Sequence, residues 1–325
     1  MCKRFARHSL RAFYMSNFNK LLVFVSLVCS VSLFWGGPGA YSSRSFQQVW
    51  NLGHLLLFAI LTYLTLKWSE IISHWPFLRQ VTVLLTAVFL ISLLIEFTQM
   101  GLDGRSPDVF DILRNMVGCL FAVVFFSPSR KKSSPASLRF FQIGVVTALM
   151  LFAVPLAFAI VDEIITLKQF PVLSDFETPL ERMRWTGGTD HSVVSERARS
   201  GNHSLKIHLH TSQYSGIALD YFPKDWRNYR TLAFSVFNPS DIPLKLVCRI
   251  HDENHYPNGG DYEDRFNRTL VVRGGWNDIE ISLADVMSAP QGRKMDMRRV
   301  QNIGIFSVRL PQERVIYLDY LRLVK

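Results

Sequence analysis

The stretch IEFTQMGLDGRSPDVFDILRNMVG, residues 95–118, joins the end of one apolar segment to the start of the next. Its polar residues include carboxylates, amides and an arginine, at Glu96, Gln99, Arg105, Asp108, Asp111 and Asn115. An ionised side chain near hydrocarbon is costly unless it is paired or hydrated. Polar groups gathered at such a place therefore predict a site that binds or reacts with something.

The sequence contains five apolar runs, and this stretch connects the third to the fourth. They are Leu21–Trp35, Val49–Trp68, Val81–Phe97, Ile112–Phe126 and Phe140–Ile160. At about 1.5 Å per residue, each is long enough, or nearly so, to cross a hydrocarbon core of about 30 Å. The first and fourth are the shortest and need interfacial residues to complete a crossing. We predict five transmembrane helices.

The basic residues predict the orientation of these helices. The two most basic segments contain no acid and carry Lys3, Arg4, Arg7, Arg11 and Lys20, and Arg130, Lys131, Lys132 and Arg139. Short loops rich in lysine and arginine stay on the cytoplasmic side. We therefore expect a multi-pass protein of the cell membrane, the inner membrane where there are two. Its N-terminus would be cytoplasmic, and everything after Ile160 extracytoplasmic or periplasmic.

The basic, apolar N-terminal part of the sequence has two other interpretations. The first apolar run could be a cleaved signal peptide, but no A-x-A-like cleavage site follows Trp35, so we favour its retention. The basic net charge of +10 could indicate nucleic-acid binding. From Asp162 onward, however, 22 Lys and Arg residues face 21 Asp and Glu residues, so we expect no nucleic-acid partner.

The predicted topology brings the polar residues to one membrane face. His54 lies near the outer start of the second helix, Glu96 and Gln99 near the outer end of the third, and Asp111 near the start of the fourth. Spacings of three and four place the polar residues of each helix on one stripe. Lipid offers no hydrogen-bond partner, so such stripes turn toward one another, and Gly118 would allow a close helix approach.

This pattern resembles the VanZ-like membrane family. The resemblance covers about residues 49–126 and rests on His54 followed by Glu96, Gln99, Arg105-Ser106, Asp108, Asp111, Asn115 and Gly118. It implies a connection with cell-envelope glycan or its lipid-linked precursors, and with glycopeptide susceptibility. Asn51 stands where many members have an acidic residue, so a role that needs a charge there does not carry over. The resemblance does not imply a molecular activity.

The outer-face cluster allows three roles. His54 and the carboxylates could act as general acid and base on a lipid-linked glycan precursor. Arg105 and the helix N-terminal amides could instead hold a lipid head group without reacting with it. The cluster could also be a satisfied polar network that fixes helix packing. We favour binding or packing over catalysis and leave the question of an enzyme open.

After Ile160 the sequence pattern changes. Following a short linker at Thr166–Pro171, segments such as HSLKIHLH (203–210) and TLAFSVF (231–237) alternate apolar and polar residues between turn signals. This pattern predicts an all-β, antiparallel sandwich. The predicted organisation is a basic cytoplasmic N-terminus at 1–20, a five-helix membrane domain at 21–165 and an extracytoplasmic sandwich at 166–325.

The sandwich resembles the galactose-binding-like jelly rolls of carbohydrate-binding modules. SDFE (174–177), SGNHSLKI (200–207), GGWNDIEISL (274–283) and YLDYLRL (317–323) carry the resemblance over residues 172–324. It implies a possible structural calcium ion held by Glu177, Asp319 and loop carbonyls near Gly201. We expect no other cofactor.

The best candidate for sugar binding is the segment Arg249–Asn267. It interleaves aromatic rings with fixed polar groups, at Arg249, His251, Asp252, Tyr256, Asp261, Tyr262 and Arg265. Rings of this kind stack on sugar faces while polar groups bind hydroxyls. The alternative is a solvated turn between two strands. The expected partners are membrane lipid and an envelope glycan or lipid-linked precursor, and the sequence indicates neither the ligand's identity nor the oligomeric state.

Overall fold

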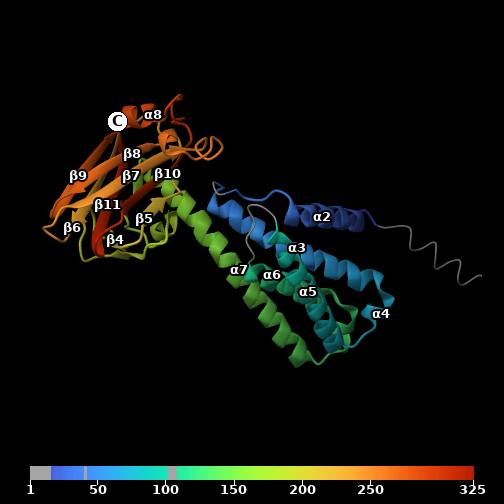
Figure 1. Cartoon of the computed structure of the whole chain (residues 1–325). Helices are drawn as coiled ribbons and strands as arrows, with labels where there is room; N and C mark the ends of the chain where they lie inside the picture. Colours follow the sequence, from blue (N-terminus) through green and yellow to red (C-terminus); the bar gives the residue numbers. More distant parts are fainter. Residues whose placement is uncertain (1–15, 40–41, 102–107) are drawn as a thin grey trace, which may run out of the picture. The chain divides into compact units, whose positions relative to one another are not determined.

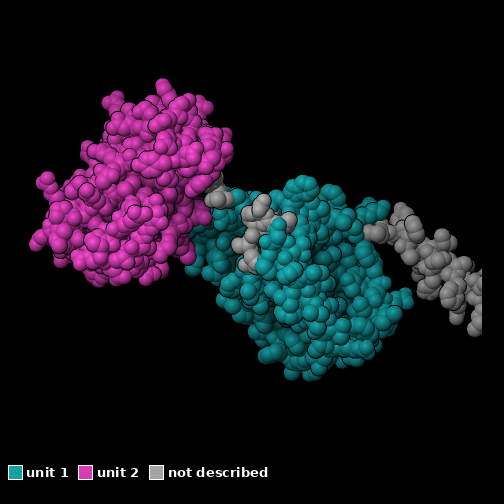
Figure 2. Space-filling view, viewed as in Figure 1, with its two compact units in different colours: residues 1–159 teal, residues 160–325 magenta. Residues whose placement is uncertain are grey.

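The computed structural model describes residues 16–39, 42–101 and 108–325 of the chain. The chain divides into two compact units, residues 1–159 and residues 160–325, which Figure 2 shows in different colours.

Unit 1 is helical (Figure 1). Its elements are α2 (Asn17–Phe34), α3 (Arg44–Trp68), α4 (Glu70–Ser73), α5 (Phe77–Gln99), α6 (Val109–Phe126), the 3-10 turn η1 (Pro128–Lys132) and α7 (Pro135–Gln169), which continues into unit 2. Within the described residues, α2, α3, α5, α6 and α7 are long and apolar enough to cross a membrane. The prediction of five transmembrane helices is confirmed.

Polar residues at the helix ends lengthen the two shortest predicted spans. Helices α2 and α6 each reach 18 residues. The Ser16 hydroxyl accepts a hydrogen bond from the Asn19 amide, and Asp108 Oδ1 accepts one from the Phe110 amide at 2.9 Å. Such caps satisfy amides that the first turn of a helix leaves without a partner. The apolar runs alone do not contain these capped turns, which is why they underestimate helix length.

Helices α3 and α6 pack backbone against backbone at Gly118. A Cβ atom at this position would lie 2.2 Å from the Leu55 carbonyl oxygen and 3.0 Å from the Ala59 amide nitrogen. Only glycine fits such a contact, and the prediction of a close helix approach at Gly118 is confirmed. The neighbouring Cys119 and Ala122 are buried in the same interface.

A second polar contact holds the loops at the other end of α5. The Gln80 amide donates to the Ile72 and Ser73 carbonyls at 2.7 and 3.2 Å. Its oxygen accepts from the hydroxyls of Ser127 at 2.5 Å and Ser129 at 2.9 Å. All three side chains are buried, so this network joins the turn before α5 to the turn after α6.

Unit 2 is a sandwich of two antiparallel sheets (Figure 1). In the first sheet the order is β3-β4-β11-β6-β9, with β1 paired to β11; the bounds are β1 Val172–Ser174, β3 His191–Val194, β4 Ser204–Leu209, β6 Thr231–Asn238, β9 Gly275–Ser282 and β11 Arg314–Val324. In the second sheet the order is β2-β5-β10-β7-β8; the bounds are β2 Trp185–Thr186, β5 Tyr214–Leu219, β7 Leu244–Asp252, β8 Phe266–Val272 and β10 Val300–Val308. The short helical elements are η2 (Glu181–Arg184), η3 (Tyr262–Asp264) and α8 (Leu283–Ser288). The predicted all-β sandwich is confirmed.

Alternate residues of the strands fill the space between the sheets. On β7, Leu246, Cys248 and Ile250 are buried in the core, while Lys245 and Arg249 belong to the opposite, outer face. On β10, Ile303 and Ile305 point into the same core. This alternation defines an outer face on the β2-β5-β10-β7-β8 sheet.

Helix α7 continues past the expected end of its apolar run. We expected a helix ending at Ile160 and a linker at 166–171, but α7 ends at Gln169. The fully buried Arg184 of η2 donates from Nε to Asp162 Oδ1 at 3.0 Å and from Nη2 at 2.9 Å, and from Nη1 to the Leu173 carbonyl at 3.0 Å. Asp162 thus has a buried partner within unit 2, and its charge does not interrupt the helix.

We predict that Asp162→Ala destabilises unit 2. The substitution leaves the Arg184 charge buried without its carboxylate, which lowers the free energy of unfolding by about 3–5 kcal/mol. The measurement is urea denaturation of a fragment spanning residues 160–325. In the same fragment, Lys168→Ala is the control because Lys168 is exposed on the same helix. Equal stability of the two variants would contradict the assignment of Asp162 to the core of unit 2.

Candidate functional site

The centre of the membrane cluster is a contact between α3 and α6. His54 Nε2 lies 3.4 Å from Asp111 Oδ2, and the histidine is buried. The Gly118 contact lies two turns further along α6 and sets the separation of the two helices. The structure thus brings together two of the residues predicted from the sequence.

Arg114 is a member of the cluster that the sequence analysis missed. Its guanidinium forms an ion pair with Asp111 on the same helix, and its Nη1 lies 3.2 Å from Asp108 Oδ2. The same group lies 5.6 Å from the centre of the Phe152 ring on α7. Arg114 could have been found by the argument used for the carboxylates, because an arginine in an apolar helix requires a partner.

Glu96 joins the cluster from the end of α5. Its Oε2 accepts a hydrogen bond from the Asp108 amide at 2.8 Å, while its Oε1 is buried and has no hydrogen-bond partner among the described residues. One turn deeper, the Asn115 amide donates to Ser92 Oγ at 2.9 Å, and its Oδ1 is likewise buried without a partner in the described chain. Two acceptor atoms are therefore available to a ligand or water.

The remaining two predicted members differ in position. Gln99 Nε2 donates to the Leu33 carbonyl at 2.7 Å. This hydrogen bond joins α5 to α2 and is directed at neither His54 nor Asp111. Arg105 lies outside the described residues. The cluster that the structure describes consists of His54, Ser92, Glu96, Asp108, Asp111, Arg114 and Asn115.

A mainly apolar cavity of about 180 Å³ adjoins His54. It lies between α2 and α3 and is lined by Cys29, Ser32, Leu33, Phe46, Val49, Trp50, Gly53 and His54. His54 lines this cavity and also contacts Asp111, so the cavity lies next to the polar cluster. Apolar walls of this kind suit an apolar group, with the imidazole as a polar point at one side.

In unit 2, the outer face of the five-stranded sheet carries a row of hydrogen-bonded polar groups. Thr186 Oγ1 donates to Asp220 Oδ2, and Asn302 Nδ2 donates to Asp220 Oδ1, both at 2.5 Å. Asn302 Oδ1 in turn accepts from Arg249 Nη2 at 2.9 Å. The Arg249 guanidinium carbon lies 5.9 Å from the centre of the Phe306 ring. Strands β2, β7 and β10, together with the residue that follows β5, thus place polar groups and an aromatic ring on one surface.

The loop after β7 adds two exposed rings to this end of the sheet. Tyr256 is 57% exposed and Tyr262 is 63% exposed. Arg265 lies 5.4 Å from the centre of the Tyr262 ring. Asp261 lines a separate open hollow of about 650 Å³ together with Asn258, Glu263, Asp264, Gln291, Gly292 and Arg293.

Two of the predicted sugar-binding residues lie below the surface. Asp252 is buried and accepts from Arg293 Nη1 and Nη2 at 2.6 and 2.9 Å, and from the Asp296 amide at 2.7 Å. His251 is buried against the His255 ring, 4.7 Å away between centres. Arg293, which also donates to Asp264, is the side chain that holds this loop in place. The sequence analysis did not identify it.

Burial lowers the pKa of His251 to about 4, and the charges of Arg249 and Arg265 contribute to this shift. Its ordinary pKa is 6.5. As the pH falls from 6.5 to 4, the unfolded chain takes up a proton that the folded chain does not. Stability contributed by the neutral imidazole is therefore lost as the pH falls through this window.

We predict that His251→Phe flattens this pH dependence. In the unchanged fragment 160–325, the free energy of unfolding should fall by up to about 3 kcal/mol between pH 6.5 and pH 4 on account of this group. Denaturant titrations at several pH values measure the slope. His208→Phe is the control, because His208 is exposed on β4, and a slope unchanged by His251→Phe would contradict the prediction.

The two carboxylates expected to hold calcium both bind the loop around Gly201. Glu177 Oε1 accepts from the amides of Asn202 and His203 at 2.7 and 2.8 Å. Asp319 Oδ2 accepts from the Ser200 amide at 3.0 Å, and its Oδ1 is buried with no hydrogen-bond partner among the described residues. Calcium needs six to eight oxygen ligands, and the amide hydrogens here occupy carboxylate oxygens. One free oxygen does not form a calcium cage, and calcium binding stays a prediction.

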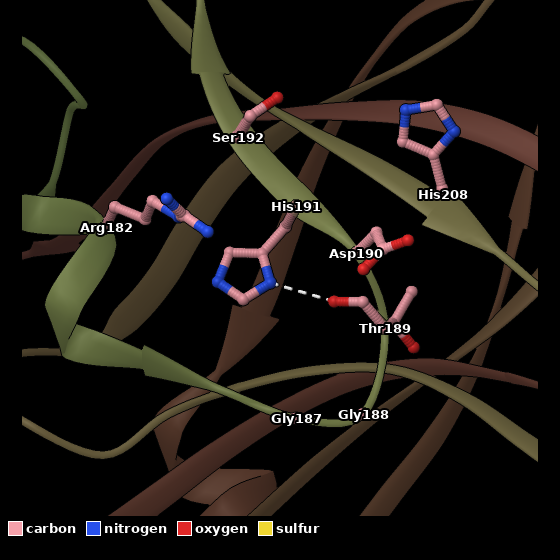
Figure 3. A pocket seen from close by; sticks show the side chains of 8 residues that line it. All are labelled: Arg182, Gly187, Gly188, Thr189, Asp190, His191, Ser192 and His208. Carbon is pink, nitrogen blue, oxygen red and sulfur yellow. Dashed lines mark hydrogen bonds between the residues drawn. The ribbon is translucent and has the colours of Figure 1, made fainter.

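A further hollow of about 430 Å³ lies beside β3 (Figure 3). It is lined by Arg182, Gly187, Gly188, Thr189, Asp190, His191, Ser192 and His208. His191 Nδ1 lies 2.9 Å from the Thr189 carbonyl oxygen, the hydrogen bond drawn in Figure 3. Across the described chain, no three histidine, cysteine or acidic side chains are grouped as a metal site. The hollow is thus polar but has no arrangement suited to a metal.

Residues 4–130 match the model of the VanZ/LLP1 family. The resemblance stated from the polar pattern is therefore confirmed for the membrane part of the chain. No curated protein sequence matches the chain.

Among solved structures, the chain is similar to a family 11 carbohydrate-binding module from Clostridium thermocellum in complex with a β-1,3-1,4-mixed-linked tetrasaccharide. The identity is 15%, the match covers 47% of this chain and 94% of that chain, and the TM-score is 0.36. An exo-β-agarase is similar with 14% identity and a TM-score of 0.38, over 47% of this chain and 25% of that chain. This likeness concerns architecture alone, and the chain spans about a quarter of the agarase.

Proposed function

We propose that this VanZ-like, multi-pass membrane protein binds cell-envelope components at two places. The outer face of the five-stranded sheet binds polysaccharide, and the membrane cluster binds the head group of a lipid-linked envelope component. In this proposal the N-terminus is cytoplasmic and unit 2 is extracytoplasmic, as the distribution of basic residues predicts.

The observation that carries the glycan proposal is the polar row on the outer face of the sheet. Asp220, Asn302 and Arg249 orient one another through hydrogen bonds, so their remaining donors and acceptors have fixed directions. Phe306 and the exposed Tyr256 supply rings beside them. A sugar needs this combination of a stacking surface and oriented polar groups.

The membrane proposal is supported by the free acceptor atoms and by the charge of the cluster. Glu96 Oε1 lacks a hydrogen-bond donor in the described chain. The three carboxylates of Glu96, Asp108 and Asp111 face the guanidinium of Arg114 and the imidazole of His54. This excess of acceptors favours hydroxyl or amine groups of a head group as the atoms that contact the cluster. The adjoining apolar cavity would receive part of the hydrocarbon chain.

The His54–Asp111 contact supports a second candidate, an enzyme acting on the lipid-linked molecule. A carboxylate that binds one nitrogen of an imidazole orients the ring and increases its basicity, which is a requirement for a general base. In that role, His54 would take a proton from an attacking hydroxyl or water and Glu96 would contact the same substrate.

We predict that Glu96→Gln and His54→Gln separate these roles. In purified full-length protein in lipid nanodiscs, a binding role predicts at least tenfold weaker binding of a lipid-linked oligosaccharide, with thermal stability kept within a few degrees. Equilibrium binding and thermal unfolding are the measurements. Glu70→Gln is the matched control, because it removes the charge of an exposed carboxylate outside the cluster.

Two other outcomes differ from a loss of lipid binding. Loss of product formation from that lipid, with binding retained, would support the enzyme. Loss of thermal stability alone would show that the cluster serves helix packing and would contradict both candidates.

We also predict that Asn302→Ala weakens glycan binding by the fragment 160–325 at least tenfold. The substitution breaks the row between Asp220 and Arg249 and removes the direction it imposes on both side chains. A glycan array followed by titration of the best binder measures the effect. Gln213→Ala, at an exposed site, is the control, and absence of binding to any arrayed glycan would contradict the proposal for unit 2.

A further inference from the structure

Arg249 presents a positive charge at the centre of the outer sheet face. Its guanidinium donates to Asn302 Oδ1, a neutral acceptor, and its buried Nε has no hydrogen-bond partner in the described part of the chain. No carboxylate lies within ion-pair distance of it among the described residues. Beneath the side chain, Gly304 leaves space: a Cβ there would lie 3.3 Å from Arg249 Nε.

Arg265 places a second guanidinium on the same face. Arg249 is opposite Asn267 in the pairing of β7 with β8, and Arg265 precedes Asn267 by two residues in extended backbone. Residues two apart on a strand share a face, and such diagonal neighbours are within reach of long side chains. Arg265 Nε is also buried without a hydrogen-bond partner in the described residues, and its guanidinium lies over the Tyr262 ring.

Three carboxylates close to this face have other hydrogen-bond partners. Asp252 and Asp264 both bind Arg293, and Asp220 accepts hydrogen bonds from neutral groups at the other end of the polar row. Burial lowers the pKa of Arg249, and the nearby charge of Arg265 lowers it further, while the charge of Asp220 opposes the shift only in part.

We propose that Arg249 and Arg265 bind an anionic group of the glycan, so that the sandwich selects acidic over neutral polysaccharide. This inference rests on the glycan-binding function proposed for the sheet face. Guanidinium groups bind carboxylate, sulfate and phosphate oxygens in the same forked geometry, so the shared chemistry is a planar or tetrahedral oxyanion. Tyr256 and Tyr262 provide the surface on which the sugar ring carrying that group stacks.

The test is calorimetric titration of the full-length protein in nanodiscs with three oligosaccharides of equal length. These are a hexagalacturonate, its carboxyl-reduced neutral counterpart, and a sulfate ester of that neutral hexasaccharide. We expect at least one charged probe to bind tenfold or more tightly than the neutral one at low salt, with the difference shrinking in 0.5 M NaCl. Tighter binding of the uronate alone would identify a carboxylate, and of the sulfated probe alone a tetrahedral ester.

Arg265→Gln should remove most of the preference for charge while leaving the affinity for the neutral probe within about threefold. Arg249→Gln should also remove the preference, but it breaks the hydrogen bond to Asn302 and should weaken binding of the neutral probe as well. The matched control is Lys245→Gln, which removes one positive charge from the same strand and the same face, about 13 Å along β7. Arg265→Gln breaks no side-chain hydrogen bond among the described residues and serves where Arg249→Gln does not fold.

Three results would overturn the inference. Equal affinity for charged and neutral probes would remove the anion preference and leave glycan binding standing. An equal loss on Lys245→Gln would show a general effect of charge and not a site. Failure of all three probes to bind would remove the preference together with the glycan-binding function itself.

Discussion

The membrane part of this protein depends on one contact, the approach of the α3 and α6 backbones at Gly118. Hydrocarbon supplies no hydrogen-bond partners, so a histidine on one helix and a carboxylate on the next persist there only if they reach one another. The absence of a side chain at Gly118 permits that reach, and the His54–Asp111 contact is its result. A larger residue would separate the helices and leave two ionisable groups to be hydrated individually. The close approach of α3 and α6 at Gly118 therefore determines both the helix packing and the polar contact of the site.

Unit 2 uses buried charge in another way. Arg184 is enclosed by Asp162, the Leu173 carbonyl and the end of α7, and Arg293 binds both Asp252 and Asp264. In each case one guanidinium joins segments that are distant in sequence, which its five donors allow. Removing either arginine would leave buried carboxylates unpaired. By contrast, Arg249 and Arg265 have no carboxylate at ion-pair distance among the described residues, and this difference separates the arginines that build the fold from those available to a ligand.

Much of the architecture could be predicted from local pattern, because apolar length defines membrane helices and two-residue alternation defines sandwich strands. Glu96, Asp111 and His54 could be predicted to meet, since three helices of known direction bring them to one face. Arg114 was not predicted because it lies beside the polar stripe of α6 that Asp111, Asn115 and Gly118 form. Asp252 and His251 were predicted to bind sugar at the surface, but both are buried. Asp252 pairs with Arg293, 41 residues away, and His251 packs against His255; no local pattern reveals the pairing of Asp252 with Arg293. The end of α7 was misjudged because the apolar run ends at Ile160 while the helix continues to Gln169, and the pairing that buries Asp162 against Arg184 is not local.

The two candidate sites have opposite local charge, although the chain as a whole is basic. Among the described residues, the carboxylates of the membrane cluster outnumber its one guanidinium, while the two guanidiniums on the outer sheet face have no bonded carboxylate. The net charge of +10 comes mostly from segments outside both sites. Ligand chemistry has to be inferred from each site's own neighbours, because a charge beyond a Debye length of about 10 Å is largely screened where water has access. On that basis the cluster suits groups that donate hydrogen bonds, and the sheet face suits groups that accept them. One envelope component could satisfy both sites only if it carried donors at its lipid-linked end and oxyanions along its glycan.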